Sequence, residues 1–87
     1  MTGNFNVELT NSARKELRDL GSEVIERLAM KLVALGSDPF ASGTKRLEGG
    51  DGLYRVRVGD YRIVYSVDTD ARTVRVQAIR HRSQAYR

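Results

Sequence analysis

The sequence predicts an α+β domain in which an N-terminal strand and an αα-hairpin precede an antiparallel β-meander. Two observations support this fold class. Residues 54–65 alternate apolar and polar side chains on both sides of a Gly-Asp pair, and residues 10–36 contain two amphipathic segments at helical spacing. Because 87 residues suffice for one modest core, we expect a single domain spanning residues 1–87. Its helices are expected to pack on one face of the sheet.

The central hairpin is predicted to turn at Gly59-Asp60, because glycine tolerates the positive φ that the first position of a type II′ turn requires. A two-residue turn sets the register of both strands. The expected cross-strand pairs are Val58–Tyr61, Arg57–Arg62, Val56–Ile63 and Arg55–Val64. This register places Arg55, Arg57 and Arg62 together on one face. The other face receives the apolar and aromatic side chains of Tyr54, Val56, Val58, Tyr61, Ile63 and Tyr65.

The N-terminal part is predicted to form a strand and two helices. The strand pattern comprises Phe5, Val7 and Leu9 in alternation with polar residues. The first helix has possible caps at Thr10, Asn11 and Ser12, followed by Ala13, Leu17 and Leu20 at helical spacing, and is expected to end at Gly21. The second has a possible cap at Ser22 and an apolar stripe of Ile25, Leu28, Leu32 and Leu35, and is expected to end at Gly36.

The C-terminal part completes the meander. Residues 37–52 are rich in Gly, Ser and Asp, which predicts a surface loop anchored through Leu47. The Asp-rich segment 68–71 indicates another turn before a last strand at residues 73–79. Placing Val74, Val76 and Ala78 on the apolar face is the favourable arrangement for that strand, and it leaves Arg75 and Gln77 beside Arg62. The direction in which Arg80 faces stays open, because it lies at or beyond the strand end.

Composition excludes several classes of function. The formal charge of +4 and the pI near 9.9 indicate a mild basic bias that is compatible with an anionic partner. The chain has no cysteine and a single histidine, so we expect no disulfide, no metal site and no cofactor. No apolar run approaches the length of a membrane span and no secretory leader is visible, so we expect a cytoplasmic protein.

The arginine face is the strongest chemical signal in the chain. Like charges directly opposite each other destabilise a sheet, and no carboxylate occupies a facing position in the derived register. Guanidinium groups bind phosphate oxygens with two parallel hydrogen bonds, so this face is interpreted as an anion site rather than as a solvated basic surface. His81 is a possible proton donor or acceptor, or an ordinary surface histidine. Tyr86 could contact a substrate base or dock on the core.

The order of elements and the residues in them resemble a RelE-type toxin of the RelE/ParE superfamily over nearly the whole chain. The most specific segment is Gly59-Asp60-Tyr61-Arg62-Ile63-Val64-Tyr65. Supporting segments are Ala13-Arg14-Lys15-Glu16-Leu17, Asp38-Pro39, Lys45-Arg46-Leu47, Leu53–Val58 and His81-Arg82-Ser83-Gln84-Ala85-Tyr86. The resemblance implies a fold similar to microbial ribonucleases, a cognate antitoxin as partner, and metal-free cleavage of the mRNA codon in the ribosomal A site.

By the same resemblance, the catalytic positions of the family fall on Arg55, Arg57, Arg62, Arg80 and Tyr86. Phosphate contacts to ribosomal or messenger RNA are expected from Lys45, Arg46, His81 and Arg82. Some relatives carry lysines where Arg55 and Arg57 stand here, and arginine is effectively always protonated. The general base is therefore left open, with His81 or the ribosome itself assisting proton transfer.

Two other functions remain compatible with the sequence. A ParE-like toxin would share the scaffold but poison DNA gyrase without being a nuclease, and the fold alone does not separate the two. A degenerate binding module would have lost activity and would be harmless when expressed without a partner. The concentrated arginine face and the C-terminal His-Arg and Tyr residues favour RNA cleavage.

Overall fold

The computed structural model describes residues 4–40, 43–47 and 52–85 of the chain, and it confirms the α+β fold class. The elements in order are β1 (Asn6–Leu9), α1 (Asn11–Arg18), α2 (Ser22–Ser37), β2 (Thr44–Arg46), β3 (Leu53–Val58), β4 (Tyr61–Asp68), β5 (Thr73–His81) and α3 (Arg82–Ala85). They form a five-stranded sheet in the order β1-β5-β4-β3-β2. Among the strand pairs of the described residues, only β1–β5 is parallel, so the sheet is mainly antiparallel as predicted.

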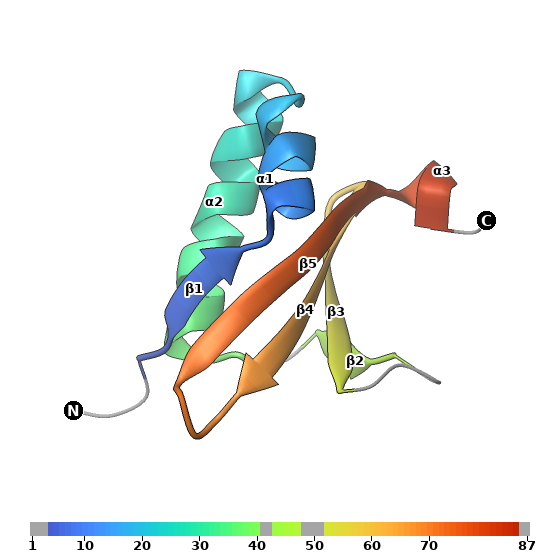
Figure 1. Cartoon of the computed structure of the whole chain (residues 1–87). Helices are drawn as coiled ribbons and strands as arrows, with labels where there is room; N and C mark the ends of the chain where they lie inside the picture. The colour runs from blue at the N-terminus through green and yellow to red at the C-terminus, as the bar shows by residue number, and fades with distance from the viewer. Residues whose placement is uncertain (1–3, 41–42, 48–51, 86–87) are drawn as a thin grey trace.

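Both long helices pack on one face of the sheet (Figure 1). The helices contribute Ala13, Leu28, Leu32 and Leu35 to the core, and the strands contribute Val56, Ile63, Tyr65, Val74, Val76 and Ile79. All ten of these side chains are buried. Their burial leaves the opposite face of the sheet, called the outer face below, for polar and charged side chains. No helix in the described part of the chain is long and apolar enough to cross a membrane.

The predicted register of the β3–β4 hairpin is confirmed at all four expected pairs, with Arg57 directly opposite Arg62. Gly59 has a φ of +59°, which is the left-handed conformation that favours glycine. Its turn is also closely covered, because a Cβ atom at Gly59 would lie 3.2 Å from an Arg27 guanidinium nitrogen. Gly59 therefore allows the turn that sets the strand register, and its lack of a side chain leaves room for Arg27 of α2.

Local hydrogen bonds explain where the two helices begin. Thr10 is the N-cap of α1, and its hydroxyl accepts a hydrogen bond from the Ala13 N–H at 3.1 Å. The prediction that Ser22 caps α2 is wrong, because the first turn already closes on the carbonyl of Gly21 and Ser22 is the first helical residue. Gly36 does not end α2, which continues to Ser37. Gly36 instead lies where β1 crosses closely, and its carbonyl accepts the Phe5 N–H at 2.7 Å.

The predicted loop at residues 37–52 contains a short strand that the sequence pattern did not indicate. β2 pairs antiparallel with β3, so that Lys45 lies opposite Arg55. The buried Tyr65 holds this strand in place: its hydroxyl donates to the Pro39 carbonyl at 2.7 Å and lies 3.0 Å from the Thr44 hydroxyl. Leu47, the predicted anchor, is half-buried. Strand formation here depends on contacts from distant residues, which local composition does not reveal.

A β-bulge in β5 overturns the predicted facing of Ala78. Tyr65 pairs with Val76, and the preceding Val64 pairs with Ala78, so Gln77 is one extra residue in β5. Beyond the bulge the alternation changes phase. Ala78 therefore lies on the outer face, while Ile79 is buried in the core. The core gains a larger apolar side chain than a regular strand would have placed there.

Candidate functional site

The outer face carries a row of three arginines from three adjacent strands. Arg57 on β3 pairs with Arg62 on β4, and Arg62 pairs in turn with Arg80 on β5. Directly paired residues have their side chains on the same face of the sheet. The first pair follows from the two-residue turn, but the second follows from the bulge at Gln77. Without that extra residue, Arg80 would have fallen on the core side.

A hollow of about 310 Å³ adjoins this row. Among the residues that the structure describes, it is lined by Gly43, Lys45, Arg55, Arg57 and Arg62, four of which are cationic. The predicted sharing of one face by the three hairpin arginines is consistent with this arrangement. In the part of the chain that the structure describes, no carboxylate oxygen lies within ion-pairing distance of Arg55 or Arg57. The hollow is therefore a concentration of positive charge that an anion would relieve.

Arg80 is held apart from the hollow by a carboxylate that the sequence did not indicate. A guanidinium nitrogen of Arg80 lies 3.2 Å from Glu16 Oε2, and the other carboxylate oxygen of Glu16 accepts the Ile79 N–H at 2.8 Å. β1 ends before this part of β5, so α1 supplies the missing hydrogen-bond partner to the strand edge. Glu16 thus neutralises one of the predicted catalytic arginines. Nothing in the local sequence of α1 distinguishes it from other acidic helix residues.

Two residues that were predicted to contact RNA, Arg46 and His81, lie away from the hollow. Arg46 pairs with Tyr54, which places it on the face opposite Lys45, although its side chain is exposed. His81 pairs with Tyr61 on the helix-covered face, and the two rings meet edge to face at 5.1 Å. The His81 Nδ1 atom accepts the Ser83 N–H at 3.2 Å, which engages that nitrogen locally. These positions separate His81 from the arginine row.

The remaining two predicted residues belong to the C-terminal segment. Arg82 is exposed beside the β3–β4 turn: its N–H donates to the Asp60 carbonyl at 2.7 Å, and its guanidinium lies 3.9 Å from the Asp60 carboxylate. This places Arg82 near the end of the hairpin that carries the arginines. Tyr86 lies outside the described residues.

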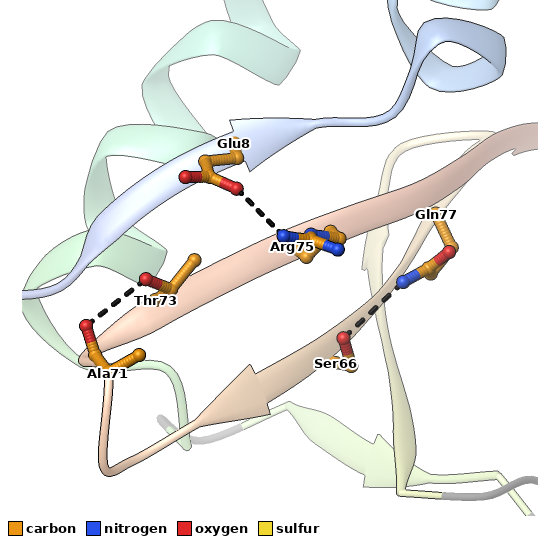
Figure 2. Close-up of polar contacts among 6 residues, drawn as sticks. All are labelled: Glu8, Ser66, Ala71, Thr73, Arg75 and Gln77. Atoms are coloured by element: carbon orange, nitrogen blue, oxygen red, sulfur yellow. Dashed lines mark hydrogen bonds and ion pairs between the residues drawn. The ribbon is translucent and has the colours of Figure 1, made fainter.

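The other end of the outer face has a different character (Figure 2). Arg75 on β5 forms an ion pair with Glu8 on β1 at 3.2 Å, so its charge is balanced within the chain. Figure 2 also shows the Gln77 side chain directed at Ser66, with the amide nitrogen 3.4 Å from the hydroxyl. Across the described residues, no group of three or more His, Asp or Glu side chains could hold a metal ion. The main electrostatic feature of the outer face is therefore the positive charge at the hollow beside the arginine row.

These features define a small α+β domain with two helices on one sheet face and a cationic hollow on the other. The known proteins that this chain resembles are toxins of toxin-antitoxin systems. A family model described as ParE toxin of type II toxin-antitoxin system, parDE, matches residues 7–86. An archaeal chain of Methanocaldococcus jannaschii, provisionally named toxin RelE1, is 34% identical over 86 residues, covering 95% of this chain and 96% of its own.

Solved structures give the same result. The isolated RelE toxin of E. coli is 32% identical, with 94% of this chain and 90% of that chain covered and a TM-score of 0.79. The toxin-antitoxin complex RelBE2 of Mycobacterium tuberculosis contains a chain that is 25% identical, with 95% and 97% covered and a TM-score of 0.85. The chain belongs to the RelE/ParE superfamily and is a RelE-type toxin of a type II toxin-antitoxin system.

Proposed function

We propose that this toxin is a ribosome-dependent endoribonuclease that cleaves mRNA in the ribosomal A site and so inhibits translation. The single observation that carries the proposal is the cationic hollow beside the in-register row of Arg57, Arg62 and Arg80. Like charges paired directly across a sheet are unfavourable, and a bound anion relieves their repulsion. A phosphodiester of RNA is an anion whose oxygens match the guanidinium geometry.

The reaction proposed is attack of a ribose 2′-hydroxyl on the adjacent phosphate, with expulsion of the 5′-oxygen of the next nucleotide. Negative charge develops on the phosphate oxygens in the transition state, and preorganised donors stabilise it. We assign this role to Arg55, Arg57 and Arg62, which border the hollow. Arg80 joins them when a substrate phosphate competes with Glu16 for its guanidinium. Lys45, on the same border, holds the RNA backbone.

Proton transfer needs groups other than these arginines, because a guanidinium does not lose its proton in a protein. We propose that Tyr86 stacks on a substrate base or donates its phenolic proton to the leaving oxygen. The second proton transfer is assigned to a group of the ribosome. His81 is a weaker candidate than its sequence context indicated, because the register places it with Tyr61 on the opposite face.

We further propose that a cognate antitoxin controls this activity. Related toxins have been solved as complexes with their RelB antitoxins, from E. coli, Mycobacterium tuberculosis and Pyrococcus horikoshii. An acidic segment of the antitoxin would complement the charge of the hollow and compete with RNA for it. Arg46 and Arg82, which are exposed outside the hollow, are proposed to contact ribosomal or messenger RNA phosphates.

The proposal is tested by incubating the purified protein with programmed ribosomes and mapping mRNA ends by primer extension. The wild-type chain is expected to cut within the A-site codon. Arg62→Ala should lower the cleavage rate about 100-fold or more, because it removes a donor to the transition state. Arg14→Ala, which removes an exposed arginine of α1 on the other side of the sheet, is the matched control and should cleave normally. A fully active Arg62→Ala protein would refute the assignment.

The second candidate function is that of a ParE-like toxin that poisons DNA gyrase, and the match to the ParE family model supports it. The two functions give opposite results in the same cells. Expression of the toxin without an antitoxin should leave DNA supercoiling normal and fragment mRNA if the nuclease proposal holds. Intact mRNA together with a supercoiling defect would select the gyrase function instead.

A further inference from the structure

A second hollow, of about 220 Å³, lies on the outer face at the end of the β4–β5 hairpin. It is lined by Ser66, Asp68, Ala71, Thr73, Arg75 and Gln77. Its polar side chains have local partners, as Figure 2 shows for the Thr73 hydroxyl, which donates to the Ala71 carbonyl, and for Arg75 with Glu8. The Asp68 carboxylate likewise accepts the Ala71 N–H at 3.0 Å. The longest contact is that from Gln77 to Ser66, at 3.4 Å. A hydrogen bond of that length is easily exchanged for a better one.

Gln77 occupies this position because it is the bulged residue. It has no cross-strand partner in β4, and its carbonyl accepts the Thr10 hydroxyl at 3.3 Å, which ties the bulge to the start of α1. Bulges often re-aim a side chain next to a functional site. Here the bulge does two things at once: it places Arg80 in the arginine row and it presents the Gln77 amide on the same face.

The two hollows lie on one continuous surface. Ser66 is four residues along β4 from Arg62 and has the same facing, which at about 3.3 Å per residue separates them by about 13 Å. Stacked nucleotides advance by about 3.4 Å each, so an RNA strand on the arginine row reaches Gln77 within about four nucleotides. Between the two hollows lies the Val64–Ala78 pair, an apolar strip suited to contact with a sugar or base.

Charge distinguishes what each hollow can bind. The arginine hollow is lined by four cations, whereas the charge of Arg75 is balanced by Glu8 and Asp68 adds a carboxylate to the lining of the second hollow. A phosphate is therefore attracted to the first and not to the second. The second offers an amide and a hydroxyl, which recognise the edges of neutral bases. A glutamine amide pairs through two hydrogen bonds with adenine in particular.

We propose that Gln77, supported by Ser66, reads one base of the single-stranded RNA whose backbone lies on the arginine row, with preference for adenine. The inference rests on the proposed function and adds a determinant of sequence preference to it. Gln77 touches the base and not the reacting phosphate. Its loss should therefore change which sequences are cut while leaving the cleavage chemistry intact.

The first test maps cleavage sites across a pool of mRNAs on ribosomes. In the wild-type map, adenine should be enriched at one position at a fixed offset from the cut bond. Gln77→Ala should reduce that preference about ten-fold while leaving cleavage at the best sites nearly unchanged, because each two-bond contact discriminates by about that factor. Gln77→Glu should move the preference toward cytosine, whose amino group donates to a carboxylate. Asn6→Ala, which removes an exposed amide from β1, should keep the wild-type map.

The second test needs no catalysis and separates failure of this inference from failure of the nuclease proposal. Short fluorescent oligoadenylate and oligocytidylate are titrated with wild-type protein and Gln77→Ala at one salt concentration. Tighter binding of oligoadenylate by the wild type, lost in the variant, supports the inference even if no variant cleaves mRNA. Equal discrimination by both proteins, or cleavage maps that Gln77→Ala leaves unchanged, overturns it.

Discussion

Arg62 and Ile63 are neighbours in β4, but they belong to two faces of the sheet that are built in different ways. Ile63 is fully buried and belongs to a core made from three strands and two helices. Arg62 lies between two other arginines in the row across β3, β4 and β5. One face stabilises the domain by burying apolar area, while the other accepts repulsion between like charges. The inner face therefore serves folding, and the proposed function assigns ligand binding to the outer face.

The largest expected effect comes from the inner face. Ile63→Ala should lower the free energy of unfolding by about 2–5 kcal/mol, because it removes buried methyl and methylene groups and leaves a cavity. Urea denaturation followed by circular dichroism measures the change. Val64→Ala, one residue further along β4 on the outer face, is the matched control and should cost clearly less. Equal losses for the two variants would contradict the assignment of the faces.

A smaller loss is expected for Tyr65→Phe, which keeps the buried ring and removes its hydroxyl. The Pro39 carbonyl would lose its donor, at a cost of about 1–3 kcal/mol. Burial raises the pKa of Tyr65 in the folded state. The unfolded chain therefore releases this proton first, so the contribution of Tyr65 to stability is complete below about pH 10 and declines as pH rises further. Unfolding curves at alkaline pH should show a shallower decline for Tyr65→Phe than for the wild type.

Glu16 contacts both the backbone of β5 and the Arg80 side chain. Its variants should therefore have two modest effects, one on stability and one on RNA binding, that can be measured separately. Glu16→Ala removes the acceptor for the Ile79 N–H and should cost about 1 kcal/mol in unfolding free energy. Glu16→Gln keeps an oxygen for that N–H but no longer pairs ionically with Arg80. It should therefore steepen the salt dependence of RNA binding, by a slope of up to about 0.7, because Arg80 becomes available to one more phosphate. An unchanged slope would indicate that Arg80 does not approach the RNA.

The smallest effect is the most direct test of repulsion on the outer face. Arg57→Thr removes one partner of a like-charge pair and places a good strand former there, so the free energy of unfolding should rise by about 0.5 kcal/mol. Thermal unfolding at low and high salt provides the measurement. The gain should shrink at high salt, which screens the repulsion. Destabilisation by Arg57→Thr at low salt would show that the arginine row contributes to the fold.

Local sequence predicted the hairpin and the helices because short-range rules govern them. The two-residue turn at Gly59-Asp60 determines which residues of β3 and β4 face each other, so the Arg57–Arg62 pair followed from the sequence. Helical spacing likewise predicted the buried positions Leu28, Leu32 and Leu35. The most specific segment of the family resemblance, residues 59–65, lies in the same hairpin. These features depend on residues that are close together along the chain.

The rest of the candidate site was decided by tertiary contacts. The bulge aligns Arg80 with Arg62 and places Gln77 on the outer face while Ile79 is buried in the core, and no local sequence pattern predicts it. The same holds for the pairing of Lys45 with Arg55, which depends on β2 joining the sheet edge. Glu16 reaches Arg80 only because α1 lies against β5 where β1 ends. The sequence by itself determined which arginines share the hairpin face. Long-range packing decided which cations surround a hollow and brought Arg80 against Glu16, because both depend on residues far apart along the chain.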